Sequence, residues 1–591
     1  MKILASLRGA LTAISLILIV TATSRAGLEE ALPEECLVFV GVDDLERLKA
    51  GFDKTAWGRF LGDPGLSAMK ESFRKKVSEL GADAEEEAGV NPFDLLDMMS
   101  GSAAGFLLEL GLPASGPDPS GAPAISMGFV VGVGEKGDEF LGLVDELFED
   151  PLKKGIAVRE NEEEGDITVT VIRDAEEQEG MSHELRYAVV DGVFLALIES
   201  EDLVEKGHFG GLVDGLAGES ENPLSAAGGY TDSLAAKAED GVRIYADLRR
   251  LIQQTILMGK AEGEMDEESE GIVEALSPED LGYFSASLEL GEEGTAFNVG
   301  LDWAGQGHLL EVLKALFVTG APQTARLMPD KPLSANIFFI DLLAGLDAGF
   351  AAAREIAPEP AKAAQEQMEI GFQQEGFHVR TDLLANLAGE ISLFTARIED
   401  ELDALPGTED DPQSLCALIS LKDGSKVESV IESLLRSSGM HAARKREEFQ
   451  GHALYSLPIP VLGSKARYAI LDDLLIFSPS AELIQDTLRR RGESGLPTLA
   501  DNENFSAIFD AAPDGRVTAA GYNDSAASVR ALLEGLKMVM DEGALSELGL
   551  GEEGLDFELP APDLADKYFK DSSVSVFTVS EHGVRLTSKG P

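Results

Sequence analysis

Three glycines that follow an apolar run have the spacing of a nucleotide-binding motif. Gly132, Gly134 and Gly137 form a G-x-G-x-x-G pattern between the apolar segment 125–131 and an amphipathic helical pattern at 138–148. In a parallel βαβ unit this pattern lets the backbone approach a pyrophosphate at the start of a helix. The pattern therefore raises the hypothesis of NAD or FAD binding, which depends on the elements around it.

The surroundings of these glycines do not fit a dinucleotide site. Leu141 stands four residues after the last glycine, where such folds place a small side chain, and the segments that follow are typical of antiparallel hairpins. Glu160 lies about 20 residues further on, as the fingerprint requires, but it belongs to a run of acids. We therefore interpret Gly132 and Gly134 as the bend at a strand end, and we expect no cofactor.

A second short motif is Ser67-Ala68-Met69-Lys70, which has the S-x-x-K spacing of the nucleophile in penicillin-recognising enzymes. No K-[ST]-G completes the set, and Ser334-Ala335-Asn336 matches the middle element only loosely. Leu66, Met69 and Phe73 follow helical spacing. The stretch therefore favours an amphipathic helix over a nucleophile.

Other catalytic and metal motifs are missing from the sequence. It contains no G-x-S-x-G, no H-E-x-x-H and no calcium-loop pattern, and its paired carboxylates are too numerous for one pair to be selected. We predict no catalytic, cofactor-binding or metal residue. We expect surface or turn positions for the seven histidines: His183, His208, His308, His378, His441, His452 and His582.

The amino-terminal 26 residues have the features of a secretory signal peptide. Lys2 and Arg8 make a positive start, residues 11–20 are apolar, and Ser24-Arg25-Ala26 is a small-x-small cleavage site. The apolar stretch is short for a membrane span of about 20 residues, although an uncleaved anchor is the alternative. No later segment has the length and apolarity of a span. We expect an exported protein, periplasmic or extracellular.

Charge and cysteine content limit the partners. The chain has 106 acidic and 48 basic residues, a net charge of −58, and 44% hydrophobic residues, which is typical of a globular protein. Such a charge repels nucleic acid and anionic lipid headgroups. A basic protein, a cation or an apolar ligand remains a possible partner. The alternative is that the acidic surface only keeps the protein soluble. Cys36 and Cys416 lie in apolar runs, so we expect buried thiols, with a single disulfide left open.

The chain contains an internal repeat. Segment 185–203 and segment 466–483 share Arg-Tyr-Ala, two aliphatic residues, an acidic two-residue turn (Asp191-Gly192 or Asp472-Asp473) and a second apolar run. Further segments correspond in the same order along both halves. The repeat predicts an α+β fold of two tandem related modules, each a largely antiparallel sheet with amphipathic helices. The predicted boundaries are 1–26 signal peptide, 27–306 module 1, 307–321 helix and linker, and 322–591 module 2.

Within the repeat, an ungapped alignment of Gly137 with Gly424 places Ile419 opposite Gly132 and Leu421 opposite Gly134. The repeat therefore lacks two of the three glycines. Predicted helices are 61–80, 138–148 and 426–435, and predicted acidic loops are 160–166, 174–179 and 262–270.

Residues 32–73 resemble an uncharacterised family of exported bacterial proteins that is known only as a domain of unknown function. The resemblance rests on a proline-led strand ending at Val42-Asp43-Asp44-Leu45, then Trp57-Gly58-Arg59-Phe60-Leu61 and Asp63-Pro64. It implies an exported protein and no assigned activity. Independently of it, Asp43 or Asp44 is expected to cap the helix that starts near Leu45, and Asp63 is expected to cap the turn that starts at Pro64.

Together these features predict an exported, acidic, non-enzymatic protein with an envelope-associated binding or scaffolding role. The alternative is an exported hydrolase whose carboxylates are not recognisable from sequence. Convergent carboxylates in a deep site would favour the hydrolase.

Overall fold

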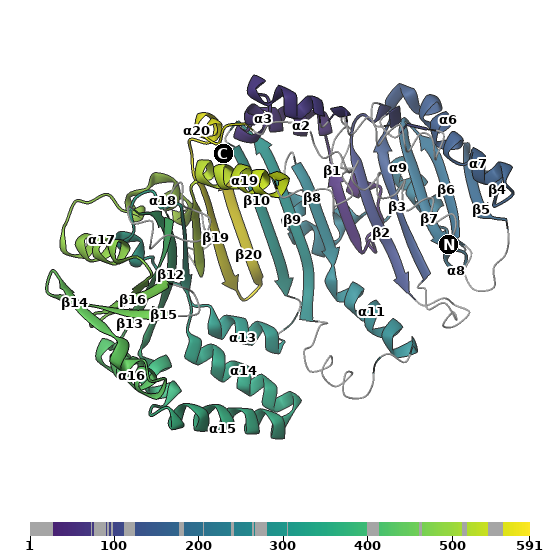
Figure 1. The fold of residues 1–591 in the computed structure, drawn as a ribbon. Helices are drawn as coiled ribbons and strands as arrows, with labels where there is room; N and C mark the ends of the chain where they lie inside the picture. The colour runs from purple at the N-terminus through teal and green to yellow at the C-terminus, as the bar shows by residue number, and fades with distance from the viewer. Residues whose placement is uncertain are drawn as a thin grey trace. The chain divides into compact units, whose positions relative to one another are not determined.

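The computed structural model shows a mixed α+β protein, as predicted, with antiparallel strand pairing within each of its two units (Figure 1). The predicted signal peptide, residues 1–26, lies outside the described residues. The structure describes residues 28–591 except 73, 76–89, 92–93, 96–97, 112–123, 176–182, 205, 238–240, 263–264, 266–279, 293, 304, 306, 399–412, 460–463, 511–516 and 542–559.

The chain divides into two compact units. Unit 1 consists of residues 1–270, 278–305 and 532–564, and unit 2 consists of residues 271–277, 306–531 and 565–591.

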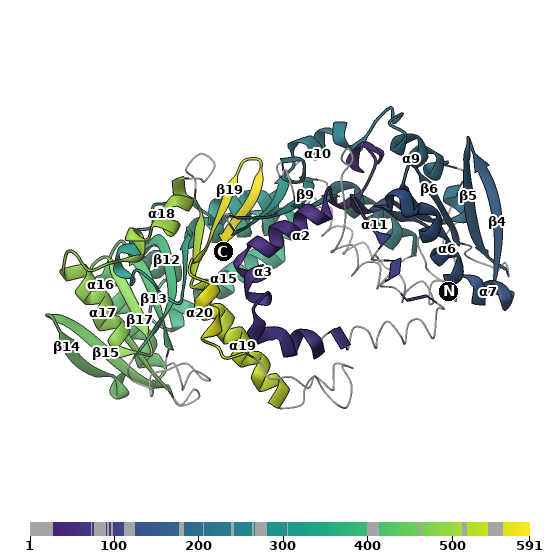
Figure 2. The ribbon, with the colours of Figure 1, turned by 90° about the horizontal axis from the view of Figure 1, so that it is seen from above.

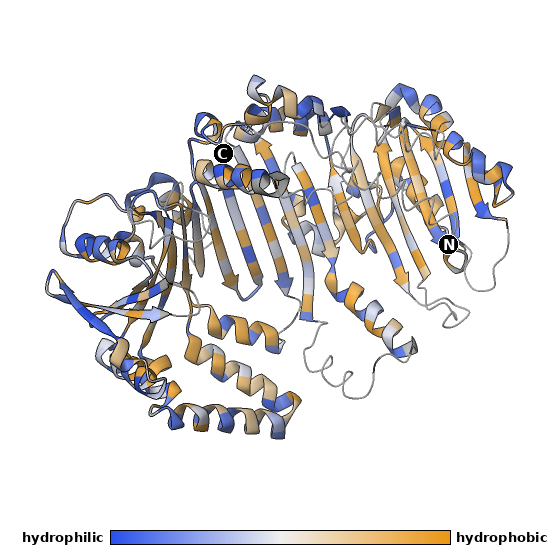
Figure 3. Ribbon diagram, in the orientation of Figure 1, coloured by the Kyte–Doolittle hydropathy of each residue, from blue (hydrophilic) through white to orange (hydrophobic). Residues whose placement is uncertain are grey.

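Unit 1 contains an antiparallel sheet with the strand order β4-β5-β6-β7-β3-β2-β1-β8-β9-β10. Figure 3 shows that β1, β2 and β3 are hydrophobic along most of their length, which is typical of strands that pack on both faces. The strands are β1 (Val38–Val42), β2 (Ala103–Gly111), β3 (Ala124–Gly132), β4 (Ala157–Glu164), β5 (Ile167–Asp174), β6 (His183–Val190), β7 (Val193–Ser200), β8 (Gly241–Asp247), β9 (Leu281–Gly291) and β10 (Gly294–Trp303).

The two faces of this sheet bury separate clusters. Along β3, Val130 enters one cluster and Val131 the other, because successive side chains point to opposite faces. Phe209 of α9 packs into the first cluster, and Phe140 of α6 and Leu48 of α2 pack into the second. We name these surfaces the α9 face and the α6 face of unit 1, and Figure 2 shows α9 and α6 on opposite sides of the strands. The helices are α2 (Leu45–Lys54), α3 (Ala56–Leu61), α6 (Gly137–Leu147), α7 (Glu149–Lys153), α8 (Glu201–Val204), α9 (His208–Leu216), α10 (Gly228–Asp232) and α11 (Leu248–Glu262).

The sheet of unit 2 has the strand order β14-β15-β16-β17-β13-β12-β11-β18-β19-β20, again antiparallel throughout. This is the order of unit 1 with ten added to each strand number. The strands are β11 (Ser334–Phe339), β12 (Leu387–Arg397), β13 (Gln413–Leu421), β14 (Lys445–Phe449), β15 (His452–Ile459), β16 (Ser464–Ile470), β17 (Leu474–Ser478), β18 (Ala519–Asn523), β19 (Ser573–Ser580) and β20 (Gly583–Gly590).

The faces of the unit 2 sheet are also distinct. Ile476 of β17 packs with Ile484 of α17, whereas its neighbour Leu475 packs with Leu435 of α16. We name these surfaces the α17 face and the α16 face. The remaining helices are α13 (His308–Leu316), α14 (Leu342–Ile356), α15 (Pro358–Gln374), α16 (Gly424–Ser437), α17 (Ala481–Gly492), α18 (Glu503–Asp510), α19 (Ser525–Asp541) and α20 (Leu564–Tyr568).

Helix caps recur at matching places. Of the two predicted candidates, Asp44 caps α2 by accepting a hydrogen bond of 2.8 Å from the Arg47 N–H, and Asp341 caps α14 in the same way. Asp63 caps the 3₁₀ turn at Pro64–Leu66, also as predicted.

The predicted hairpin turns are confirmed. Asp191 and Gly192 join β6 to β7 with φ angles of 50° and 78°, the two positive values that a type I′ turn requires. Asp472 and Asp473 join β16 to β17.

Two of the three predicted helices are confirmed, and the third is interrupted. α6 and α16 confirm the segments 138–148 and 426–435. The segment 61–80 is interrupted, because α3 ends at Leu61 and Pro64 starts a separate turn; Phe73 and residues 76–80 lie outside the described residues.

One loop prediction is wrong. Residues 160–164 form the second half of the edge strand β4, and only Gly165 and Asp166 form the turn to β5. Pairing with β5 outweighs the low strand propensity of the acids, which also protect an edge strand from association. Most of the predicted loops 174–179 and 262–270 lies outside the described residues.

Candidate functional site

Gly132 and Gly134 of the G-x-G-x-x-G pattern have structural roles. A side chain on Gly132 would collide with the Ser100 carbonyl oxygen, and Gly134 has a φ of +53°, which favours glycine. The N–H groups of Val133 and Gly134 both donate to the Gly192 carbonyl, at 2.8 and 2.9 Å. These two amides are therefore bonded within the protein rather than directed at a phosphate. Moreover, β3 is antiparallel to β2 and β7, unlike the strands of a dinucleotide site.

The second unit corrects the predicted alignment by one residue. The Leu421 N–H donates to the Asp473 carbonyl at 2.8 Å, the counterpart of the bond from Val133 to Gly192. Gly132 is therefore equivalent to Ser420 rather than Ile419, and Gly134 to Lys422 rather than Leu421. The ungapped alignment failed because the 3₁₀ turn at Gly134–Lys136 adds one residue to unit 1. Neither equivalent is a glycine.

The Ser67 motif shows no built site. Ser67 is exposed, Lys70 is half-buried, and Leu66 provides the buried contact of this turn. The helical interpretation fits these exposures.

Both cysteines are free and buried. The Cys36 thiol donates to the Val38 carbonyl at 3.1 Å, and burial raises its pKa to about 12. Burial also raises the pKa of the Cys416 thiol. Because the thiolate is the reactive form, neither residue is suited to nucleophilic chemistry.

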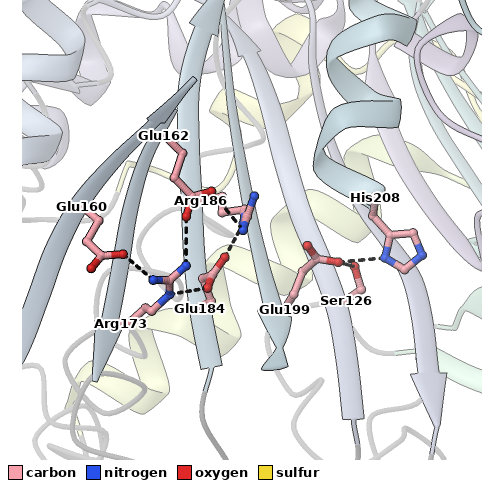
Figure 4. A network of polar contacts seen from close by, with 8 residues as sticks. All are labelled: Ser126, Glu160, Glu162, Arg173, Glu184, Arg186, Glu199 and His208. Atoms are coloured by element: carbon pink, nitrogen blue, oxygen red, sulfur yellow. Dashed lines mark hydrogen bonds and ion pairs between the residues drawn. The ribbon is translucent and has the colours of Figure 1, made fainter. Parts of the chain in front are cut away.

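The most concentrated polar group lies on the α9 face of unit 1. Glu184 on β6 and Glu199 on β7 are directly opposite each other and are 6% and 1% exposed. Ser126 lies opposite Glu199 on β3, and Arg173 lies opposite Glu184 on β5. One row across four strands therefore brings together two buried carboxylates and their partners (Figure 4).

Glu184 is neutralised by arginines. Its Oε2 accepts from Arg173 Nε at 2.5 Å, and its Oε1 accepts from Arg186. Arg173 also contacts Glu160 and Glu162 on β4. The hydrogen bond that Arg173 donates to Glu184, together with the neighbouring carboxylates, raises the pKa of the Arg173 guanidinium. This part of the row is a closed ion-pair lattice.

Glu199 has a different set of partners. Its Oε1 lies 2.8 Å from His208 Nδ1 and accepts from Ser126 Oγ at 3.0 Å, while His208 Nε2 is 3.7 Å from Glu109. His208 is the first residue of α9, so these contacts join a helix to β3 and β7. Ser126 is fully buried and bonds the carboxylate rather than the imidazole, so the three residues do not form the serine–histidine–acid relay of a hydrolase.

A second buried cation is paired with two carboxylates. Arg243 on β8 contacts Glu29 through two hydrogen bonds of 2.7 and 2.9 Å and also contacts Asp43. The Tyr230 hydroxyl lies 3.3 Å from the same guanidinium, and burial raises the pKa of this hydroxyl. This cluster joins the amino-terminal 3₁₀ turn to the sheet.

One polar triad occurs in both units. Asp145 of α6 accepts from Arg159 Nη2 at 2.8 Å and from the Tyr187 hydroxyl at 2.6 Å. In unit 2, Glu432 of α16 accepts from Arg444 at 2.8 Å, and Arg444 lies 3.2 Å from the Tyr468 hydroxyl. Each triad joins a helix to its sheet, although the tyrosine hydroxyl donates to the carboxylate in unit 1 and accepts from the arginine in unit 2.

The α6 face of unit 1 continues beyond α2 and α6 as a partly exposed apolar surface. Val40 on β1 and Phe297 on β10 are 39% and 41% exposed, and Ile244 and Val299 are half-buried. The amphipathic helix α11 packs against β2 and β9 at one end. The open face of unit 1 is defined as Val38, Val40, Ile244, Phe284, Phe297, Val299 and Leu301.

The α16 face of unit 2 also carries exposed apolar side chains. Leu393, Leu415 and Phe477 are 36%, 38% and 42% exposed. They lie on β12, β13 and β17, and they define the open face of unit 2. Antiparallel sheets that face water on one side normally carry polar residues there, so both faces need an explanation.

Comparison of the chain with protein-family models, with curated proteins and with solved structures finds no match. Function must therefore be inferred from the chain's own geometry.

Within the described ranges, no group of three or more His, Cys, Asp or Glu side chains is arranged to hold a metal ion. None of the helices in the described part of the chain is long and apolar enough to span a membrane.

Sequence reasoning selected no site residue and missed the buried row. The expectation that His208 is a surface or turn residue is wrong, because it is half-buried against Glu199. A usable signal was present for Glu199, which is the one charged residue in the largely apolar strand 193–200.

Proposed function

We propose that this chain is an exported, acidic, non-enzymatic binding protein of two duplicated modules, and that it binds apolar ligands in the envelope. The observation that carries the proposal is the pair of open apolar faces. Val40 and Phe297 in unit 1, and Phe477 in unit 2, are exposed on sheet faces where polar residues are usual. Exposed apolar surface of this kind commonly marks a binding site.

The duplication is supported by equivalent strands and contacts. Both sheets have the same strand order, and an arginine, a carboxylate and a tyrosine are grouped beside the equivalent helix in each. A backbone bond at the sheet centre also recurs: Asp247 N–H donates to Leu37, and Asp524 N–H donates to Leu333, at 2.8 and 2.9 Å.

A non-enzymatic role is supported by the state of the buried charges. A general acid or base must be able to reach its substrate and exchange a proton with it. Glu184 and Glu199 instead have oxygens bonded to arginine, serine and histidine side chains of the same sheet. The row is therefore better suited to holding α9 and β4 in place than to catalysis.

The amino-terminal residues support a location outside the cytoplasm, and the net charge limits the class of ligand. The features of residues 1–26 support transfer out of the cytoplasm, and the net charge of −58 disfavours nucleic acid and anionic lipid surfaces. Deletion of residues 2–26 is expected to retain the protein in the cytoplasm, which cell fractionation measures.

A titration with a neutral fluorescent probe tests the binding function. We expect the chain from residue 27 onward to bind N-phenyl-1-naphthylamine saturably, with a fluorescence increase, because this uncharged probe fits an apolar face. The anionic 1-anilinonaphthalene-8-sulfonate is the control, and it should bind more weakly because of the net charge. Absence of saturable binding of the neutral probe would contradict the proposal.

A further inference from the structure

The strands that carry the open face of unit 1 can be compared, position by position, with the equivalent strands of unit 2. In unit 1, the row Val40, Ile244, Ala286 and Val299 crosses β1, β8, β9 and β10 on the α6 face. The equivalent row in unit 2 crosses β11, β18, β19 and β20. The correspondence follows from Leu37 and Leu333, which make the same backbone hydrogen bonds in the two units and lie three residues before Val40 and Asn336. That row consists of Asn336, Gly521, Ser575 and Ser588.

The neighbouring row shows the same contrast. Unit 1 has Val38, Ala246 and Phe284, and unit 2 has Ser334, Asn523 and Ser573 at the equivalent positions. Apolar residues in unit 1 are therefore replaced by polar or small ones over the centre of the face.

The next row does not show this contrast. Val42 and Val242 in unit 1 correspond to Phe338 and Ala519 in unit 2, so both rows are apolar. In unit 1, Val42 and Val242 pack with Leu48 of α2. The apolar character is thus shared where a helix covers the sheet and restricted to unit 1 over the centre of the face.

The contrast shows which apolar residues of unit 1 are not required for folding of the sheet. Unit 2 forms the same strand order with Asn336 and Ser588 in the central row, so the sheet itself does not require apolar residues there. Part of the apolar surface in unit 1 supports α11, which packs against β2 and β9. However, Val40 stays 39% exposed and Leu257 of α11 stays 60% exposed, so α11 does not cover the surface.

We infer that unit 1 alone is specialised to hold the apolar ligand and that this ligand is an uncharged aliphatic chain. This inference rests on the proposed binding function and assigns it to one module. Rows 38/246/284 and 40/244/286/299 contain no charged or hydrogen-bonding side chain, so they suit an alkyl chain.

The net charge decides between apolar occupants. A fatty-acid carboxylate, an anionic lipid surface and a second copy of this chain all carry negative charge, and the chain itself has a net charge of −58. An uncharged aliphatic molecule meets no such repulsion. Dodecanol should therefore displace the neutral naphthyl probe more effectively than laurate, which has the same chain length.

The variants that test this inference copy residues of one unit into the other. Val40→Asn with Val299→Ser gives unit 1 the residues of the equivalent unit 2 positions, so the sheet should tolerate them. The control is Leu393→Asn with Phe477→Ser, which removes two exposed apolar side chains from unit 2. The gain-of-binding variant is Asn336→Val with Ser588→Val.

Titration of the chain from residue 27 with N-phenyl-1-naphthylamine distinguishes the outcomes. We expect the unit 1 variant to weaken binding by about tenfold, the unit 2 control to change it by less than about twofold, and the gain variant to add a second site. Equal weakening by the two loss variants, or no weakening by the unit 1 variant, would overturn the specialisation and leave the proposed function standing. If the unit 1 variant fails to fold, absence of a second site in the gain variant would still overturn it. Failure of the parent chain to bind would overturn both.

Discussion

Glu184 and Glu199 lie directly opposite each other on β6 and β7, and both side chains are buried. Adjacent carboxylates in a protein interior repel each other unless each has its own partners. Two arginines hold Glu184, and Ser126 and His208 hold Glu199. The strand pair therefore depends on both sets of contacts.

Removal of the His208 imidazole should destabilise unit 1. His208→Ala leaves the buried Glu199 without one of its two partners, which costs about 1–3 kcal/mol of unfolding free energy. Urea denaturation measures the change, and His582→Ala, in an exposed turn, is the control. Glu199→Gln in the His208→Ala background should restore part of the loss. Equal effects of His208→Ala and His582→Ala would show that the contact does not stabilise the fold.

Removal of the tyrosine hydroxyl from either triad should destabilise the protein by a similar amount. Tyr187→Phe and Tyr468→Phe each remove one hydroxyl from an equivalent network and should each cost about 1 kcal/mol. Double-mutant cycles with Asp145→Asn and with Glu432→Gln measure the coupling in each unit. Coupling in one unit without the other would argue against a shared structural role.

The glycine pattern predicts an effect on stability. Gly132→Ala should lower the unfolding free energy by about 2 kcal/mol or more, because its Cβ meets the Ser100 carbonyl. Gly142→Ala is the matched control: it lies in α6 with open space around it, so alanine should stabilise by about 0.5–1 kcal/mol. Thermal unfolding compares the two, and a Gly132→Ala chain as stable as the parent would refute the structural role.

The buried thiol of Cys36 predicts a pH dependence. Its pKa is raised from 9.0 to about 12 by burial, so above pH 9 the unfolded thiol ionises while the folded one stays protonated. The unfolded state is then favoured, and stability falls as the pH rises from 9 toward 12. Urea midpoints should fall between about pH 8 and pH 10.5, and less steeply in Cys36→Ala. Identical slopes in the two chains would contradict the assignment.

Local sequence signals predicted much of the fold. The Asp191-Gly192 turn, the Asp44 cap and helix α6 follow from residues that are close in sequence, whose conformational preferences act locally. The edge strand β4 was misread as a loop because its acids have low strand propensity, and only β5 and Arg173 reveal the pairing.

The candidate surfaces could not be read in the same way. Glu199 and His208 are nine residues apart in sequence, yet their contact depends on how α9 returns to the sheet. Likewise, Val40 and Val299 share a row only because β1, β8, β9 and β10 are neighbours. Strand order over such long separations is set by tertiary packing, which periodicity does not encode.

The most direct test of the central claim is native mass spectrometry of the protein purified from its own envelope. The account predicts a retained uncharged aliphatic molecule, at one copy per chain, that is lost in the Val40→Asn, Val299→Ser variant. Recovery of the bare chain, or of a bound nucleotide or peptide, would contradict it.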